Sequence, residues 1–96
     1  MKKQLPMIVK FEVKENMIEF VKVNLLKLLE PSRNDKGCIL YELHQDMEDH
    51  RIFMFYEIWE TEALWKAHDS TPHVIEFKNA TKDSIDKISY NKLNIL

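Results

Sequence analysis

One segment of this 96-residue chain, residues 51–59, is apolar on both of its alternating faces. Successive side chains of a β-strand point to opposite sides, so the residues separate into two sets: Ile52, Met54, Tyr56 and Ile58 on one face, and Phe53, Phe55 and Trp59, interrupted only by Glu57, on the other. An antiparallel sheet with helices on one side normally shows a polar face to water. The segment therefore predicts a strand covered on both faces, by helices on one side and by the sheet of a second subunit on the other.

Alternation elsewhere predicts three further strands, at residues 6–13, 38–45 and 88–96. Apolar side chains at helical spacing predict a helix capped by Asn16 and ended by Pro31. A later helix is predicted in two pieces, one over 61–69 with Ala63, Leu64 and Ala67 inward, and one that starts at Thr71-Pro72. Gly37, the only glycine, is expected to take a positive φ before the second strand. The order β-α-β-β-α-β predicts a single α+β domain over residues 1–96, with a ferredoxin-like antiparallel sheet.

Composition narrows the possible partners and the compartment. The net charge of −2 supplies no basic surface for nucleic acid or for an anionic membrane. One cysteine cannot form an internal disulfide, and no apolar run is long enough to span a membrane, so a cytoplasmic protein is expected. A chain of this size buries only about 60–65% of the surface of its unfolded form. The remaining apolar surface favours a homodimer.

The sequence lacks the motifs of nucleotide binding, of Cys-x-x-Cys sites and of histidine metal sites. There is no glycine-rich loop for nucleotide phosphates and no Cys-x-x-Cys pair. His68 and His73 are five residues apart across a proline, so a shared metal is not expected. Cys38 begins a predicted strand, where a cysteine is usually packed and inert.

His68 and His73 are nevertheless the first candidates for catalysis. His68 falls in the last turn of one helical piece and His73 in the first turn of the next. The helix dipoles would favour a protonated His68 and a neutral His73, a pair suited to removing a proton and stabilising the resulting anion. The alternative is that one caps a helix end while the other is solvated.

Glu57 is the other catalytic candidate, because its position between Phe55 and Trp59 would desolvate it and raise its pKa toward that of a useful base. The alternative is an ion pair with a lysine at the subunit contact. Four aromatic residues could stack on a flat substrate, although such residues more often belong to the core: Tyr41, Tyr56, Trp59 and Trp65.

An ordered set of short motifs resembles the antibiotic biosynthesis monooxygenase (ABM) family, including its quinol monooxygenase-like members, over roughly residues 6–85. These motifs are Gly37-Cys38, Tyr41-Glu42, Tyr56-Glu57-x-Trp59-Glu60 and Ala67-His68-x-x-Thr71-Pro72-His73, followed by Phe77. The resemblance implies a dimeric α/β barrel, in which two ferredoxin-like sheets pack face to face. It also implies a pocket between each sheet and its own helices.

The resemblance further implies a cofactor-independent monooxygenase, since family members oxidise quinols and anthrones without metal, flavin or haem. His68 or His73 would then be the base or the anion-stabilising group, and the aromatic residues would line the site of a small aromatic or quinol-like substrate. Another branch isomerises a phosphorylated signalling sugar, which would need cations such as Arg33 and Lys36. A third possibility is a ligand-binding dimer without catalysis.

Overall fold

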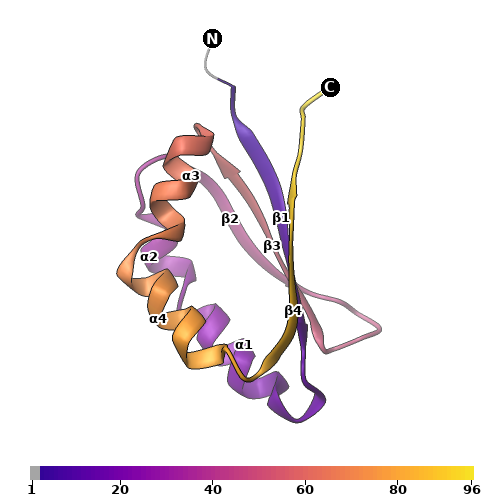
Figure 1. Cartoon of the computed structure of the whole chain (residues 1–96). Helices are drawn as coiled ribbons and strands as arrows, with labels where there is room; N and C mark the ends of the chain where they lie inside the picture. Colours follow the sequence, from indigo (N-terminus) through magenta and orange to yellow (C-terminus); the bar gives the residue numbers. More distant parts are fainter. Residues whose placement is uncertain (1–2) are drawn as a thin grey trace.

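All four α-helices lie on one face of a four-stranded antiparallel sheet (Figure 1). The structure is a computed structural model that describes residues 3–96. The strand order is β2-β3-β1-β4, which with the chain order β-α-β-β-α-β makes the fold ferredoxin-like, as predicted. The strands are β1 (Leu5–Val13), β2 (Cys38–Gln45), β3 (Ile52–Trp59) and β4 (Ile85–Lys92), and the α-helices are α1 (Ile18–Leu26), α2 (Leu29–Arg33), α3 (Glu62–Asp69) and α4 (Pro72–Thr81).

The doubly apolar segment is the central strand β3, which pairs with β1 on one side and with β2 on the other. Its residues Phe53, Phe55, Glu57 and Trp59 are buried beneath the helices, and the alternating residues are half-buried on the opposite face. No helix within residues 3–96 covers that opposite face (Figure 1). The helix-covered side of the prediction is therefore confirmed, and the other side is a surface of this single chain.

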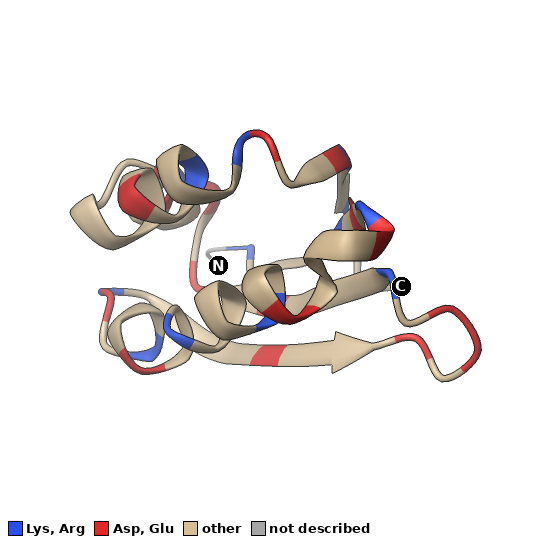
Figure 2. Ribbon diagram, turned by 90° about the horizontal axis from the view of Figure 1, so that it is seen from below, with Lys and Arg blue, Asp and Glu red and all other residues tan. Residues whose placement is uncertain are grey.

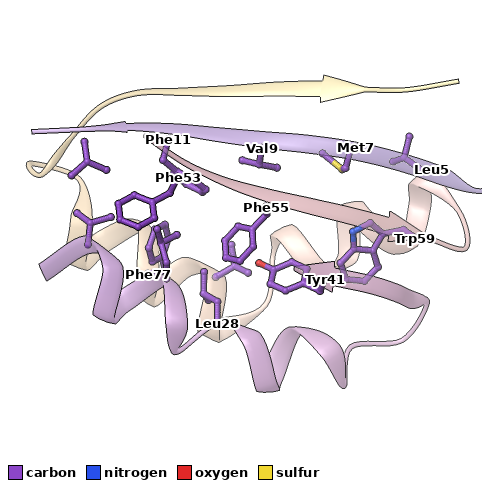
Figure 3. Close-up of a cluster of buried hydrophobic side chains, with 14 residues drawn as sticks. Leu5, Met7, Val9, Phe11, Leu28, Tyr41, Phe53, Phe55, Trp59 and Phe77 are labelled. Atoms are coloured by element: carbon purple, nitrogen blue, oxygen red, sulfur yellow. The ribbon is translucent and has the colours of Figure 1, made fainter. Parts of the chain in front are cut away.

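The core is a layer of aromatic and aliphatic side chains between the sheet and the helices (Figure 3). Phe11 of β1 packs edge-to-face on Phe55 and on Phe77 of α4, each at a ring-centroid distance of 5.8 Å. Trp59 is fully buried at the other end of the layer. This aromatic layer holds α3 and α4 against the sheet and so positions their polar side chains.

Two local signals in the first half of the chain were misread. Asn16 lies in a short 3-10 helix (Glu15–Met17), and α1 begins without a side-chain cap. Pro31 does not end a helix, because it lies inside the short helix α2. A proline is tolerated in the first turn of a helix, where the backbone N–H has no intrahelical acceptor to lose.

The second half differs at two places. Leu64 of α3 is partly buried, as predicted, but Ala63 and Ala67 are exposed, and Trp65 and His68 are other residues of this helix that are partly or fully buried. Strand β4 runs from Ile85 to Lys92 rather than from residue 88 to the end. Thr71 and Pro72 begin α4 as predicted, with Pro72 in the first turn.

Gly37 has a φ of +87°, as its position before β2 predicts. Its carbonyl accepts a hydrogen bond from the backbone N–H of Glu60, at 2.8 Å, just before α3. The turn therefore ties the start of β2 to the start of α3.

Lys and Arg are interspersed with Asp and Glu over helices, loops and strands, without a broad region of one sign in this view (Figure 2). None of the helices in residues 3–96 is long and apolar enough to cross a membrane.

Candidate active site

A narrow cavity lies between the sheet and helices α3 and α4. Its volume is about 40 Å³, room for a few water molecules. Every strand contributes to its wall, which is mostly apolar and carries a small number of titratable groups. The polar or aromatic residues on that wall are Phe11, Tyr41, Phe55, Glu57, Trp65, His68, Asp69, Phe77, Lys78 and Tyr90.

His68 is held in place by both ring packing and a hydrogen bond. It lies in the last turn of α3, is only 4% exposed, and stacks on Trp59 with the ring centroids 4.5 Å apart. Its Nδ1 lies 2.8 Å from Oδ2 of Asp35, which belongs to the loop between α2 and β2. Trp59 thus fixes the orientation of the imidazole plane, and the hydrogen bond to Asp35 fixes the direction in which Nδ1 points within that plane.

Thr71 and Asp35 together assign the ring protons of His73 and His68. The Thr71 hydroxyl donates to the backbone carbonyl of His68 at 2.7 Å, so toward His73 Nε2, 3.1 Å away, it can only accept. His73 Nε2 therefore carries a proton, and it also lies 2.8 Å from the Asp35 carboxylate. His68 donates its Nδ1 proton to the same carboxylate, which leaves Nε2 of a neutral His68 with a free lone pair.

Burial lowers the pKa of His68, and Asp35 opposes this effect only in part, while His73 adds to it. The prediction of a protonated His68 at the helix end was therefore wrong, because desolvation outweighs the effect of the neighbouring Asp35 carboxylate on the pKa. His68 lines the cavity and its Nδ1 is taken by Asp35, which is not part of the wall, so Nε2 is the nitrogen left for a ligand there. A neutral, oriented imidazole of this kind can act as a general base.

His73 occupies a different position from the one expected. It lies outside the cavity wall, is 24% exposed, and contacts the same Asp35 oxygen as His68. Of the two histidines, only His68 reaches the pocket, and His73 supports it through the shared carboxylate.

Asp35 was missed in the sequence because nothing local distinguishes it. It is 33 residues from its partner His68 and follows an asparagine in a polar loop. The one available signal was the Gly37 turn directly after it, since a tight turn fixes the direction of a preceding loop.

Glu57 is 2% exposed and accepts a hydrogen bond from Trp59 Nε1 at 2.8 Å. Burial raises the pKa of Glu57 to about 7; the Trp59 hydrogen bond opposes this rise, and the charge of Asp69 adds to it. The predicted desolvation is confirmed. No lysine is paired with Glu57 among residues 3–96, and it faces the helices rather than the bare face of the sheet.

The four aromatic residues predicted to bind substrate occupy three different places relative to the cavity: on its wall, behind His68, and on the opposite face of the sheet. Tyr41 and Trp65 line the cavity, while Trp59 lies behind His68. Tyr56 was wrongly placed at the site: strand alternation puts it on the opposite face, between its cross-strand partners Ile8 and Glu42.

The mouth of the cavity is formed by partly exposed side chains of α3, α4 and β4. Lys78 Nζ contacts both carboxylate oxygens of Asp69 at 3.1 Å, and Trp65 meets Tyr90 at a ring-centroid distance of 6.3 Å. Lys78 is the only basic side chain on the wall formed by the described residues apart from His68. Arg33 instead donates to the backbone carbonyl of Tyr41, outside the cavity.

A second arrangement lies behind the cavity wall. The ligand-type atoms of Asp35, His68 and His73 all fall within 4.8 Å of one another, so these side chains could hold a metal ion. This differs from the prediction that the spacing of the two histidines keeps them from sharing one. The bend between α3 and α4 brings the two imidazoles together.

The fold and the site define a small ferredoxin-like α+β domain with a narrow, aromatic-walled pocket beneath its helices. The family model described as antibiotic biosynthesis monooxygenase matches residues 6–80. The chain belongs to the antibiotic biosynthesis monooxygenase family.

Three individual proteins illustrate what the chain is similar to. A crystal structure of a Pseudomonas aeruginosa protein is 28% identical, with a TM-score of 0.95 over 100% of this chain and 97% of that one. A Nitrosomonas europaea protein is 22% identical, with a TM-score of 0.93 over 100% and 93% of the two chains, and shows the same fold. An uncharacterized Synechocystis protein is 36% identical over 59 residues, which are 62% of this chain and 40% of that protein.

Proposed function

We propose that this protein is a cofactor-independent monooxygenase that oxidises a small aromatic or quinol-like substrate with O₂. His68 is the general base, Asp35 is its positioning residue, and Glu57 stabilises the anion that forms. Family membership supports the class of reaction. The observation that carries the assignment of residues is the Asp35–His68 hydrogen bond, which leaves the Nε2 lone pair of a buried imidazole for the pocket.

The chemistry needs a proton acceptor and a dry site rather than a covalent catalyst. Nε2 of His68 takes the proton of a phenolic or enolic hydroxyl, and the electron-rich anion then reduces O₂. Atoms and electrons balance without another reductant: a quinol plus O₂ yields a hydroxyquinone plus water, and an anthrone methylene plus O₂ yields a carbonyl plus water. In each case one oxygen atom enters the substrate and the other leaves as water.

Glu57 suits the role of anion stabiliser. With a pKa raised to about 7, its carboxyl is substantially protonated near neutral pH and can donate a hydrogen bond. Trp59 occupies only Oε1, so the second oxygen is available toward the cavity. A hydrogen-bond donor placed where negative charge develops lowers the barrier most effectively in a dehydrated site.

The cavity has to widen for this reaction, since about 40 Å³ does not accommodate an aromatic ring. The side chains able to move are those at the mouth, because Lys78 and Tyr90 are partly exposed and their contacts are surface contacts. The base and its carboxylate, by contrast, are held by the core.

The direct test is oxygen uptake by metal-stripped protein with a panel of anthrones and quinols. We expect enzyme-dependent uptake that falls at least about 100-fold in His68→Gln, which removes the base. Asp35→Asn should lower kcat with little change in KM, because it disturbs the imidazole without touching the substrate. His50→Gln is the matched control: an exposed histidine in the β2–β3 turn, expected to leave the rate unchanged.

Uptake that is unaffected in a folded His68→Gln protein would remove His68 from the mechanism. Turnover that continues without oxygen would favour an isomerase instead, although Arg33 and Lys36, the cations expected to hold a phosphate, do not line the cavity. Tight ligand binding without turnover would indicate a binding protein.

A further inference from the structure

Three side chains from three separate segments converge behind the pocket wall. Asp35 comes from the loop after α2, His68 from the end of α3, and His73 from the first turn of α4. Oδ2 of Asp35 lies 2.8 Å from Nδ1 of His68 and 2.8 Å from Nε2 of His73. A single carboxylate oxygen therefore sits between two imidazole nitrogens.

These separations are close to those of ligands on a shared ion. With metal–ligand bonds of about 2.1 Å, two ligand atoms lie about 3.0 Å apart at a right angle and about 3.4 Å apart at the tetrahedral angle. The two contacts of Asp35 are shorter than this by a few tenths of an ångström, and the two ring nitrogens lie within 4.8 Å of each other, so side-chain rotations would bring all three atoms onto one ion. The protons now on these two ring nitrogens would move to the other nitrogen of each neutral ring as the ion binds.

We propose that Asp35, His68 and His73 form a binding site for a divalent transition-metal ion such as Zn²⁺. Two imidazoles and one carboxylate are donors typical of zinc and other late first-row ions, whereas Mg²⁺ and Ca²⁺ prefer all-oxygen sites. The three protein ligands leave the remaining coordination positions to water.

The surroundings favour this site over a chance surface cluster. Trp59 stacks on the His68 ring and holds its orientation before any ion arrives. The exposed fraction rises from 4% at His68 through 17% at Asp35 to 24% at His73, so an ion can enter past His73 while the inner ligands are shielded. Preorganised ligands lose less conformational entropy on binding a metal.

Metal at this site would also switch off the base, an inference that rests on the proposed function. A neutral His68 that binds an ion through Nδ1 must carry its proton on Nε2. The nitrogen facing the pocket would then be a donor and could not accept the substrate proton. The His68 imidazole can therefore either bind the metal ion or act as the base, but it cannot do both at once.

The test is calorimetric titration of tag-free, chelator-treated protein with ZnSO₄. One equivalent should bind, and His73→Ala should weaken binding by at least about tenfold, since it removes a direct ligand. His73 is partly exposed and outside the core, so this variant should keep the native far-ultraviolet circular dichroism spectrum. Asp35→Asn should weaken binding similarly, and His50→Ala, which removes an exposed histidine from the β2–β3 turn, should not.

Absence of one-equivalent binding would overturn the site, and so would equal affinity in wild-type protein and a folded His73→Ala variant. Loss of binding in His50→Ala as large as in His73→Ala would show surface adsorption and would also overturn it. The titration contains no substrate, so it fails independently of the oxygen-uptake assay. If both succeed, stoichiometric Zn²⁺ should inhibit oxygen uptake in wild-type protein, and a chelator should restore it.

Discussion

Glu57 shows how a single residue acquires its properties from its neighbours. On a solvated strand its carboxyl would be an ordinary acid, but β3 turns it toward the helices and Trp59 supplies only one hydrogen bond. The polar groups that share the pocket with it come from β2, α3, α4 and β4: Tyr41, His68, Asp69, Lys78 and Tyr90. Lys78 is already paired with Asp69, so burial dominates and the pKa rises to about 7.

This raised pKa makes stability depend on pH. Between about pH 4.5 and pH 7 the unfolded chain has lost the Glu57 proton while the folded protein retains it, so stability falls as the pH rises. The shift from 4.5 to about 7 corresponds to at most about 3 kcal/mol. His68, whose pKa is lowered by burial, contributes the opposite slope. Urea unfolding of metal-free protein should therefore show the Glu57 effect as a difference: the stability of wild type relative to Glu57→Gln should fall between about pH 4.5 and pH 7.

Glu76→Gln is the control for that experiment, because Glu76 is an exposed carboxyl on α4. It should retain the wild-type dependence on pH. A Glu57→Gln protein with an unchanged pH profile would show that Glu57 titrates normally.

At the scale of elements, the start of β2 and the start of α3 are locked together at one point. Gly37 takes a φ of +87°, and a Cβ built on it would lie 2.5 Å from Leu64 Cδ1 and 2.8 Å from Leu64 Cβ. The lack of a side chain at Gly37 therefore serves both the turn and the close approach of α3. The same turn follows Asp35 directly, so it also sets the position of the carboxylate that holds His68.

Gly37→Ala should consequently destabilise the protein by about 2–5 kcal/mol, through left-handed backbone strain and the clash with Leu64. Denaturant unfolding measures this loss directly. Combining it with Leu64→Ala relieves the clash but not the strain, so the double variant should lose less than the sum of the two single losses. Strict additivity would show that α3 moves away without cost.

At the scale of the whole molecule, the sheet has two unlike faces. One is buried under the helices, and the other carries half-buried apolar residues with no helix over it in residues 3–96 (Figure 1). Ile58 lies on that bare face between Pro6 and Leu40, all apolar. Such a surface favours association, and we propose that a second copy of the chain packs its own sheet there.

Ile58→Lys should therefore convert a dimer into a monomer, because it places an unpaired charge among apolar neighbours at the contact. Sedimentation velocity measures the change. Ile75→Lys is the matched control, since Ile75 is 47% exposed on α4, on the helical side. Equal sedimentation of both variants and wild type would place the contact elsewhere.

Much of the architecture was present in the sequence, because strand and helix periods depend on local alternation of apolar residues. The period-two pattern located three strands to within a residue, placed β4 only approximately, and identified β3 as apolar on both faces. The position of the only glycine before β2 predicted the positive φ of Gly37, and Pro72 marked the start of α4. Local signals that tertiary packing can override were less reliable, as Asn16 and Pro31 show.

The site depended on contacts between distant residues, which only the tertiary structure decides. The sequence alone nominated His68, His73 and Glu57, and desolvation of Glu57 followed from its neighbours on one strand. It did not reveal Asp35, nor that His68 is buried deeply enough to lower its pKa while His73 stays outside the pocket. The orientation of α3 against the sheet and the bend before α4 decide these points, because burial and hydrogen bonding depend on which segments meet in space.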